Sequence, residues 1–183
     1  MRFIAALATP LLVLAACSDT AEDAAEAAPA EDMAAVEDTQ PTDLELSAGG
    51  IVIPAQNGFE QLDVPFGSMR GATETTLANV LGEVTEQGSE PNECGLTFTS
   101  FRGLTANFRD EEFVGYWAEE PYVPEIDRAA MLEDTAVTLV EDSTLDGEFT
   151  IEQGGQTING IFAGEDEGAA VRALWAGENC IAR

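Results

Sequence analysis

The chain has 183 residues, of which 35 are acidic and 7 are basic, and its formal net charge is −28 at pH 7. Every basic residue is an arginine, because lysine and histidine are absent. Their absence removes the usual general base near neutral pH, the commonest metal ligand and the amine that forms Schiff bases. The negative surface repels nucleic acid, so none is expected as a partner. It is either a solvated surface suited to the protein's environment or a match for a basic partner.

The first residues have the pattern of a signal peptide, which we place at residues 1–16. Arg2 gives a positive start, and the apolar run over residues 3–13 is too short to span a membrane. The run ends in the sequence LAAC, residues 14–17, which resembles the lipobox of bacterial lipoproteins. The resemblance implies cleavage before Cys17, a diacylglycerol on its sulfur and a further acyl chain, such as palmitate, on the new N-terminus. Several acyl chains anchor a protein stably to a membrane. A plain signal peptide with an incidental cysteine is the alternative.

The residue after Cys17 indicates the membrane that is reached. In some bacterial groups an aspartate directly after the lipobox cysteine is associated with retention in the inner membrane. Ser18 occupies that position here. We therefore expect a lipid-anchored protein of the bacterial cell envelope, in the outer membrane and facing the periplasm.

Residues 17–48 are rich in alanine, aspartate and glutamate and contain no basic or aromatic residue. Such a segment cannot bury enough apolar surface to offset the entropy lost on ordering. Pro29 and Pro41 interrupt its helix-forming runs. The segment is predicted to be a disordered tether that holds the folded part away from the bilayer.

Apolar and aromatic residues return from residue 49 onward, and two stretches, 103–120 and 158–179, look alike. Each has a strand with a phenylalanine, an acidic turn, and a second strand that ends in Trp-Ala, which is typical of a β-hairpin. The similarity indicates an internal repeat, with chance resemblance as the alternative. The aromatic residues of the repeated strands are expected in the core, although the two tryptophans could instead form a ligand platform. These residues are Phe108, Trp117, Phe162 and Trp175.

A helix is predicted before each hairpin. Leu77 and Leu81 fall on one helical stripe within residues 69–84, and Asp127 is a suitable N-cap for a helix within residues 124–134. Further strands are expected at 96–101, 136–140 and 148–151. We therefore predict an α+β domain over residues 49–183. It would consist of tandem helix-plus-antiparallel-sheet units, at about 58–120 and 121–183, after the disordered tether.

The stretch GATETTLANVLGEV, residues 71–84, is similar to a glycine-to-leucine-glycine pattern of the SmpA/OmlA family and of proteins with the β-lactamase-inhibitor-protein fold. The matching positions are Gly71, Thr73, Leu77, Leu81 and Gly82. The resemblance implies an envelope lipoprotein in which a helix packs on an antiparallel sheet.

Two cysteines remain once Cys17 is assigned to lipid. In an exported protein the even pair Cys94 and Cys180 is expected to form a disulfide. A reactive thiol is the rival interpretation, but the spacing is not C-x-x-C and the chain has no histidine to activate a thiol.

No motif for catalysis, metal or cofactor is present. Four acidic clusters, at 110–112, 119–120, 141–142 and 165–167, lack the alternating ligands and glycine turn of a calcium loop. The sequence therefore predicts no catalytic residue, no metal and no cofactor. We expect a non-catalytic module that binds another envelope protein, as an inhibitor or assembly factor, and meets the membrane through Cys17. A small-ligand or cation-binding lipoprotein is the alternative, and an enzyme ranks third.

Overall fold

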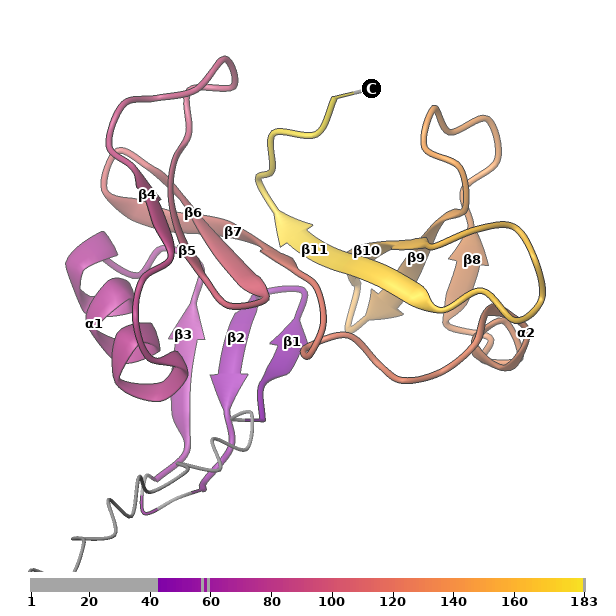
Figure 1. Ribbon diagram of the computed structural model, residues 1–183, viewed down its shortest axis with the longest axis horizontal. Helices are drawn as coiled ribbons and strands as arrows, with labels where there is room; N and C mark the ends of the chain where they lie inside the picture. Colours follow the sequence, from indigo (N-terminus) through magenta and orange to yellow (C-terminus); the bar gives the residue numbers. More distant parts are fainter. Residues whose placement is uncertain (1–42, 57, 59, 183) are drawn as a thin grey trace, which may run out of the picture. The chain divides into compact units, whose positions relative to one another are not determined.

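The computed structural model of the protein describes residues 43–56, 58 and 60–182 (Figure 1). The signal peptide, Cys17 and most of the predicted tether lie outside the described residues. Within them, no helix has the length and apolar character needed to cross a membrane.

The described residues form two antiparallel sheets. The smaller has the order β1-β2-β3, with β1 at Glu45–Ser47, β2 at Gly50–Ile53 and β3 at Leu62–Pro65. The larger has eight strands in the order β4-β5-β6-β7-β11-β10-β9-β8. Its strands are β4 (Glu86–Gly88), β5 (Thr97–Phe101), β6 (Leu104–Arg109), β7 (Glu112–Ala118), β8 (Val137–Leu139), β9 (Glu148–Gln153), β10 (Gln156–Phe162) and β11 (Val171–Gly177). The helices are α1 (Arg70–Leu81) and α2 (Arg128–Met131).

The fold is richer in β-structure than the α+β prediction. Both predicted helices occur, and the carboxylate of Asp127 accepts a hydrogen bond of 2.8 Å from the N–H of Ala130, as expected for an N-cap. However, α2 has 4 residues whereas α1 has 12. Strands β1 to β4 were not predicted, because runs of three or four residues give too little alternation to recognise. Since β1 begins at Glu45, the folded part begins before residue 49, where we expected it to start.

The two faces of the eight-stranded sheet have different environments. Side chains alternate along each strand, so Tyr116 and Trp117 in β7 point to opposite faces. We call the face that carries Tyr116 the core face and the face that carries Trp117 the open face. The core face of β5–β7 packs against α1 and the small sheet, which lie on one side of it in Figure 1.

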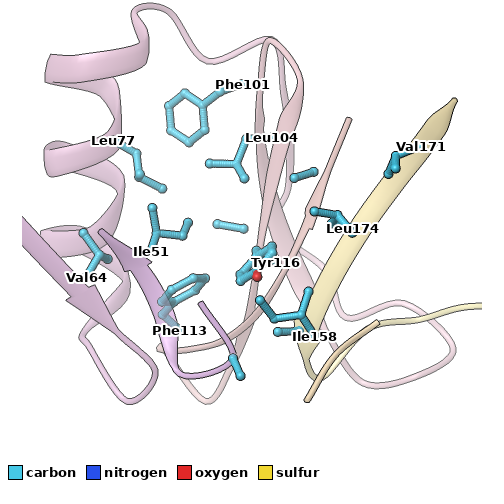
Figure 2. Close-up of a cluster of buried hydrophobic side chains, with 14 of the residues drawn as sticks. Ile51, Val64, Leu77, Phe101, Leu104, Phe113, Tyr116, Ile158, Val171 and Leu174 are labelled. Carbon is cyan, nitrogen blue, oxygen red and sulfur yellow. The ribbon is translucent and has the colours of Figure 1, made fainter. Parts of the chain in front are cut away.

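One continuous hydrophobic core fills the core face. Ile51, Val64 and Leu77 come from the small sheet and α1, and they face the side chains of β5, β6 and β7 (Figure 2). The same cluster continues through Tyr116 to the strands of the second half of the large sheet, including Leu174. The predicted core phenylalanines Phe108 and Phe162 are both fully buried in this cluster.

The large sheet repeats its own pattern about its centre. The two central strands, β7 and β11, pair antiparallel, and Trp117 in β7 lies directly opposite Trp175 in β11. Each central hairpin has an irregularity in register immediately before its phenylalanine, between residues 107 and 108 in one and between residues 161 and 162 in the other. The strand order β4-β5-β6-β7 is therefore mirrored by β8-β9-β10-β11 on the other side of the centre.

The start of each helix contacts its hairpin in the same way. Arg70 and Arg128 are the first residues of α1 and α2, and their guanidinium carbons lie 4.9 Å from the Phe108 ring and 5.9 Å from the Phe162 ring. The backbone N–H of Arg70 donates a hydrogen bond of 2.8 Å to the carbonyl of Glu111, and that of Arg128 donates one of 2.8 Å to the carbonyl of Ala169. The two halves thus share a specific arginine–phenylalanine contact as well as a strand order.

Arg70 is further held by a polar network of side chains, whereas the Arg128 guanidinium donates a hydrogen bond of 2.8 Å to the carbonyl of Glu165. The Nε of Arg70 lies 2.8 Å from Oε1 of Glu74, which also accepts hydrogen bonds from the Thr99 hydroxyl at 2.6 Å and the Gln87 amide at 2.9 Å. Burial raises the pKa of the Glu74 carboxyl, but these hydrogen bonds and the charge of Arg70 outweigh it, so the pKa is lowered overall. The ionised carboxylate therefore stabilises the packing of α1 on the sheet.

Candidate functional site

The C-terminal tail, residues 178–182, leaves β11 and lies over the open face. The disulfide expected from the sequence joins Cys94 to Cys180, with their Cα atoms 5.6 Å apart. An ion pair of 2.6 Å between Arg109 and Glu178 holds the tail beside β6. The tail is therefore tied both to the loop before β5 and to the end of β6.

Two residues under the tail show how closely it approaches the sheet. The Asn107 amide donates hydrogen bonds to the side chain of Asn179 at 2.7 Å and to the carbonyl of Glu178 at 3.3 Å. Gly115 leaves room for the backbone of Glu178, with which a Cβ at that position would collide. The tail thus forms a fixed wall on the open face.

The tryptophan pair lies at the centre of the open face rather than in the main core. The rings of Trp117 and Trp175 stack with their centroids 5.1 Å apart and their planes at 17°. Trp175 is 3% exposed and packs with Ile161 and Ala173 in a second, smaller cluster, whereas Trp117 is only partly buried at its edge. The sequence indicated two aromatic residues but not the side of the sheet on which they lie.

A pocket of about 360 Å³ lies beside Trp117 on the open face. We call it the Trp117 pocket. Asparagine side chains, hydroxyls and apolar groups line it, and none of the lining side chains is charged. The lining residues are Asn92, Phe98, Ser100, Thr105, Asn107, Trp117, Asn179, Cys180 and Ile181.

A second hollow lies on the core face of the second half of the large sheet. It consists of two adjoining cavities of about 450 Å³ and 440 Å³, which share Pro121, Val123 and Pro124. We call it the β1 groove. Its floor is apolar, and the floor residues are Leu44, Leu46, Tyr122, Ile126, Ile151, Ile158, Ala170, Val171 and Leu174.

The side chains that line the β1 groove include acids and no arginine. The acids are Asp43, Glu120, Glu125 and Asp127. Strand β1 lies along the groove and pairs only with β2, so in the described part of the chain its other edge has no neighbouring strand. Burial raises the pKa of the Tyr122 phenol, although the charge of Arg102 lowers it in part. The groove thus combines an apolar floor, a negative rim and an open strand edge.

The groove is lined by carboxylates and the Tyr122 phenol in addition to its apolar floor, whereas the pocket is lined by amides, hydroxyls and apolar groups. In residues 43–56, 58 and 60–182, no cluster of three or more cysteine, aspartate or glutamate side chains is placed to hold a metal ion. The thiols of Cys94 and Cys180 are consumed by their disulfide.

Sequence reasoning did not find either surface, because each is built from segments far apart in the chain. The groove joins residues 43–46 to 121–127 and to strands β9 to β11. Comparison with models of protein families, with curated proteins and with solved structures found no match.

Proposed function

We propose that the protein is a lipid-anchored, non-catalytic module of the bacterial cell envelope that binds another envelope protein through the β1 groove. The lipobox ending at Cys17 supports the anchor. The acidic, alanine-rich residues after it support a tether that lets the folded part reach a partner. An outer-membrane position facing the periplasm follows from Ser18.

We infer further that the large sheet and its helices form two related helix-plus-sheet units. The mirrored strand order, the matched irregularities and the paired arginine–phenylalanine contacts support this relation. The units differ in how their core faces are covered, because α1 has 12 residues and α2 has 4. The β1 groove lies on the second unit, where the helix is short.

The observation that carries the proposal is the open edge of β1 beside an apolar groove with an acidic rim. An unpaired strand edge accepts an extended segment of a partner by main-chain hydrogen bonds, while pockets beside it select alternate side chains. Leu44 and Leu46 lie two residues apart and both line the groove, so the side chains of an added strand can contact them. The negative rim favours basic residues on the solvent side of the added segment. The partner segment is therefore extended, alternately apolar and basic.

We predict that the full chain, purified from membranes in mild detergent, binds a synthetic peptide of alternating apolar and basic residues. Changing Asp43→Lys and Glu125→Lys together should weaken this binding by about tenfold or more, because the rim then repels the peptide. Binding is measured by calorimetry at two salt concentrations, and the wild-type affinity should fall as salt rises.

Glu86→Lys combined with Glu90→Lys is the matched control, since it changes the net charge equally at exposed positions outside the groove. The control should bind the peptide as the wild type does. Equal weakening in both double variants would mean that total charge alone attracts the peptide, and absence of peptide binding by the wild type would also end the proposal.

The lipid anchor has a separate test. Changing Cys17→Ser should prevent acylation, so the protein should leave the membrane fraction, because the acidic body has no attraction to anionic lipid. Fractionation of cells and intact-mass measurement of the mature N-terminus check this result. A wild-type protein that starts at an unmodified Cys17, or that is released without detergent, contradicts it.

Small-ligand binding is the second candidate function. The Trp117 pocket favours it, because its volume of about 360 Å³ falls within the range of ligand sites and its polar lining is neutral.

A further inference from the structure

Trp175 in β11 and Thr105 in β6 lie opposite Trp117 on either side of β7, and Thr105 and Trp117 both line the Trp117 pocket, so we infer that the indole face turned away from Trp175 faces the pocket. Trp175 covers the other face at a centroid distance of 5.1 Å. The indole N–H is already used, because it donates a hydrogen bond of 3.0 Å to the Glu119 carboxylate. The stacking and this hydrogen bond fix the orientation of the ring. Trp117 therefore presents a ligand with a flat aromatic surface whose orientation is fixed.

Neutral hydrogen-bonding groups surround this surface. The Ser100 and Thr105 hydroxyls lie 2.9 Å apart and share one hydrogen bond, which leaves one hydroxyl proton free to donate. The Asn107 amide nitrogen is engaged by the tail, whereas its amide oxygen has no hydrogen-bond partner among the described residues. The Asn92 oxygen caps its own loop by accepting from the N–H groups of residues 94 and 96, which leaves its amide nitrogen available.

The lining of the pocket contrasts with the composition of the chain. Charged residues make up 23% of the protein, yet none of the nine lining residues is charged. A cationic ligand would gain no ion pair there, and an anionic ligand would be repelled by the surrounding acidic protein. The neutral lining of the pocket therefore suits an uncharged ligand that both donates and accepts hydrogen bonds.

The pocket is also preorganised. Its tail wall is fixed by the Cys94–Cys180 disulfide and the Arg109–Glu178 ion pair. Its floor consists of sheet residues, and Thr105 in β6 lies directly opposite Trp117 in the adjacent strand β7. A ligand that enters this site has little side-chain ordering to induce, which reduces the entropy lost on binding.

We propose that the Trp117 pocket is a binding subsite for a neutral carbohydrate. The C–H groups on one side of a sugar ring carry partial positive charge and pack on the negative face of the indole. The hydroxyls at the rim of the sugar match the amides and hydroxyls of Asn92, Ser100, Thr105 and Asn107, because both sets donate and accept. This site is separate from the β1 groove and does not depend on a protein partner.

The test uses the full chain in detergent and a panel of soluble neutral oligosaccharides built from glucose, galactose, mannose or N-acetylglucosamine. An oligogalacturonate, which is anionic, serves as the charged probe. At least one neutral probe should bind saturably, with a change in tryptophan fluorescence and an affinity that varies little with salt. The oligogalacturonate should not bind.

Two variants locate the site. Trp117→Ala should weaken the binding of that probe by about tenfold or more, since the stacking surface is lost. If this variant does not fold, Thr105→Asp tests the same pocket by placing a carboxylate on its floor. Asn159→Asp is its matched control, because Asn159 lies opposite Trp175 as Thr105 lies opposite Trp117 but does not line the pocket.

The expected pattern is loss of binding with Thr105→Asp and wild-type affinity with Asn159→Asp. The proposal is overturned if no neutral probe binds at millimolar concentration, if only the anionic probe binds, or if Thr105→Asp and Asn159→Asp affect binding equally. None of these results bears on the peptide measurements, so failure of this site is distinguishable from failure of the β1 groove.

Discussion

Replacing Cys94 and Cys180 together by serine is expected to lower the free energy of unfolding by about 4 to 5 kcal/mol. The bond joins residues 86 positions apart, so its loss gives the unfolded chain a large gain in entropy. In the folded state the tail would then be held on the open face by the Arg109–Glu178 ion pair, by the hydrogen bonds of Asn107 to Glu178 and Asn179, and by the Glu178 N–H on the carbonyl of Val114. Denaturant titration of the oxidised wild type and the double variant measures the difference.

The wild type treated with a dithiol reductant is the control for the serine side chains. It should lose about the same free energy as the double variant, since both lack the cross-link. A difference of under about 1 kcal/mol between the oxidised wild type and both other forms would show that the unfolded chain is already compact around these residues.

Changing Glu74→Ala is expected to cost about 2 to 3 kcal/mol of stability near neutral pH. The Arg70 side chain is only 10% exposed, and the substitution leaves its charge without its nearest carboxylate. The Thr99 hydroxyl also loses the acceptor that it contacts at 2.6 Å. Thermal and denaturant unfolding at pH 7 measure the cost.

The cost of Glu74→Ala should depend on pH in a defined direction. The pKa of Glu74 in the folded protein lies below its ordinary value of 4.5, so folding favours the ionised carboxylate. Its contribution is fully present above pH 4.5 and is lost as the pH falls through the lowered pKa. The difference between wild type and variant should therefore narrow on acidification, and a difference that stays constant with pH would contradict the assignment.

Glu111→Gln provides a matched control for the same arginine. The Glu111 carboxylate lies 3.9 Å from Arg70, but its side chain is 68% exposed. An exposed ion pair contributes little, so the change should cost under about 0.5 kcal/mol.

The parts of the fold that the sequence predicted are those with strong local signals. The N-cap at Asp127 is present because its short acidic side chain satisfies a helix N–H. Phe108 and Phe162 are buried because they continue the alternation of core-facing residues in their strands, after Leu104 and Ala106 in β6 and after Ile158 in β10. The two hairpins were recognisable because each repeats phenylalanine, acidic turn and Trp-Ala.

The position of Trp117 could not be read from the sequence. Tyr116 and Trp117 are adjacent in one strand, so only one of them can face the main core. Both are large aromatic residues, and their side-chain chemistry does not indicate which of them faces the main core. The choice follows from Tyr116, whose hydroxyl donates a hydrogen bond of 3.0 Å to the carbonyl of Ser47 in β1, a strand that the sequence did not predict.

The candidate sites were hidden for a similar reason. The acidic rim of the β1 groove looks like ordinary solvated surface in the sequence, because acids occur throughout the chain. The structure places the acids of the groove beside its apolar floor, next to the open edge of β1 and the short helix α2. The Trp117 pocket was likewise invisible, since its asparagines belong to three separate segments.

The antiparallel pairing of β7 with β11 has a mechanical consequence. Because the two halves share one hydrogen-bonded sheet, neither can rotate about the other without breaking main-chain contacts. The open face and the core face of that sheet stay back to back, so a sugar on one and a peptide on the other do not compete for space. A ternary complex of the protein, the sugar and the peptide can then assemble in either order. The product of the two separate binding constants should describe its formation, because the coupling free energy between the two sites is close to zero.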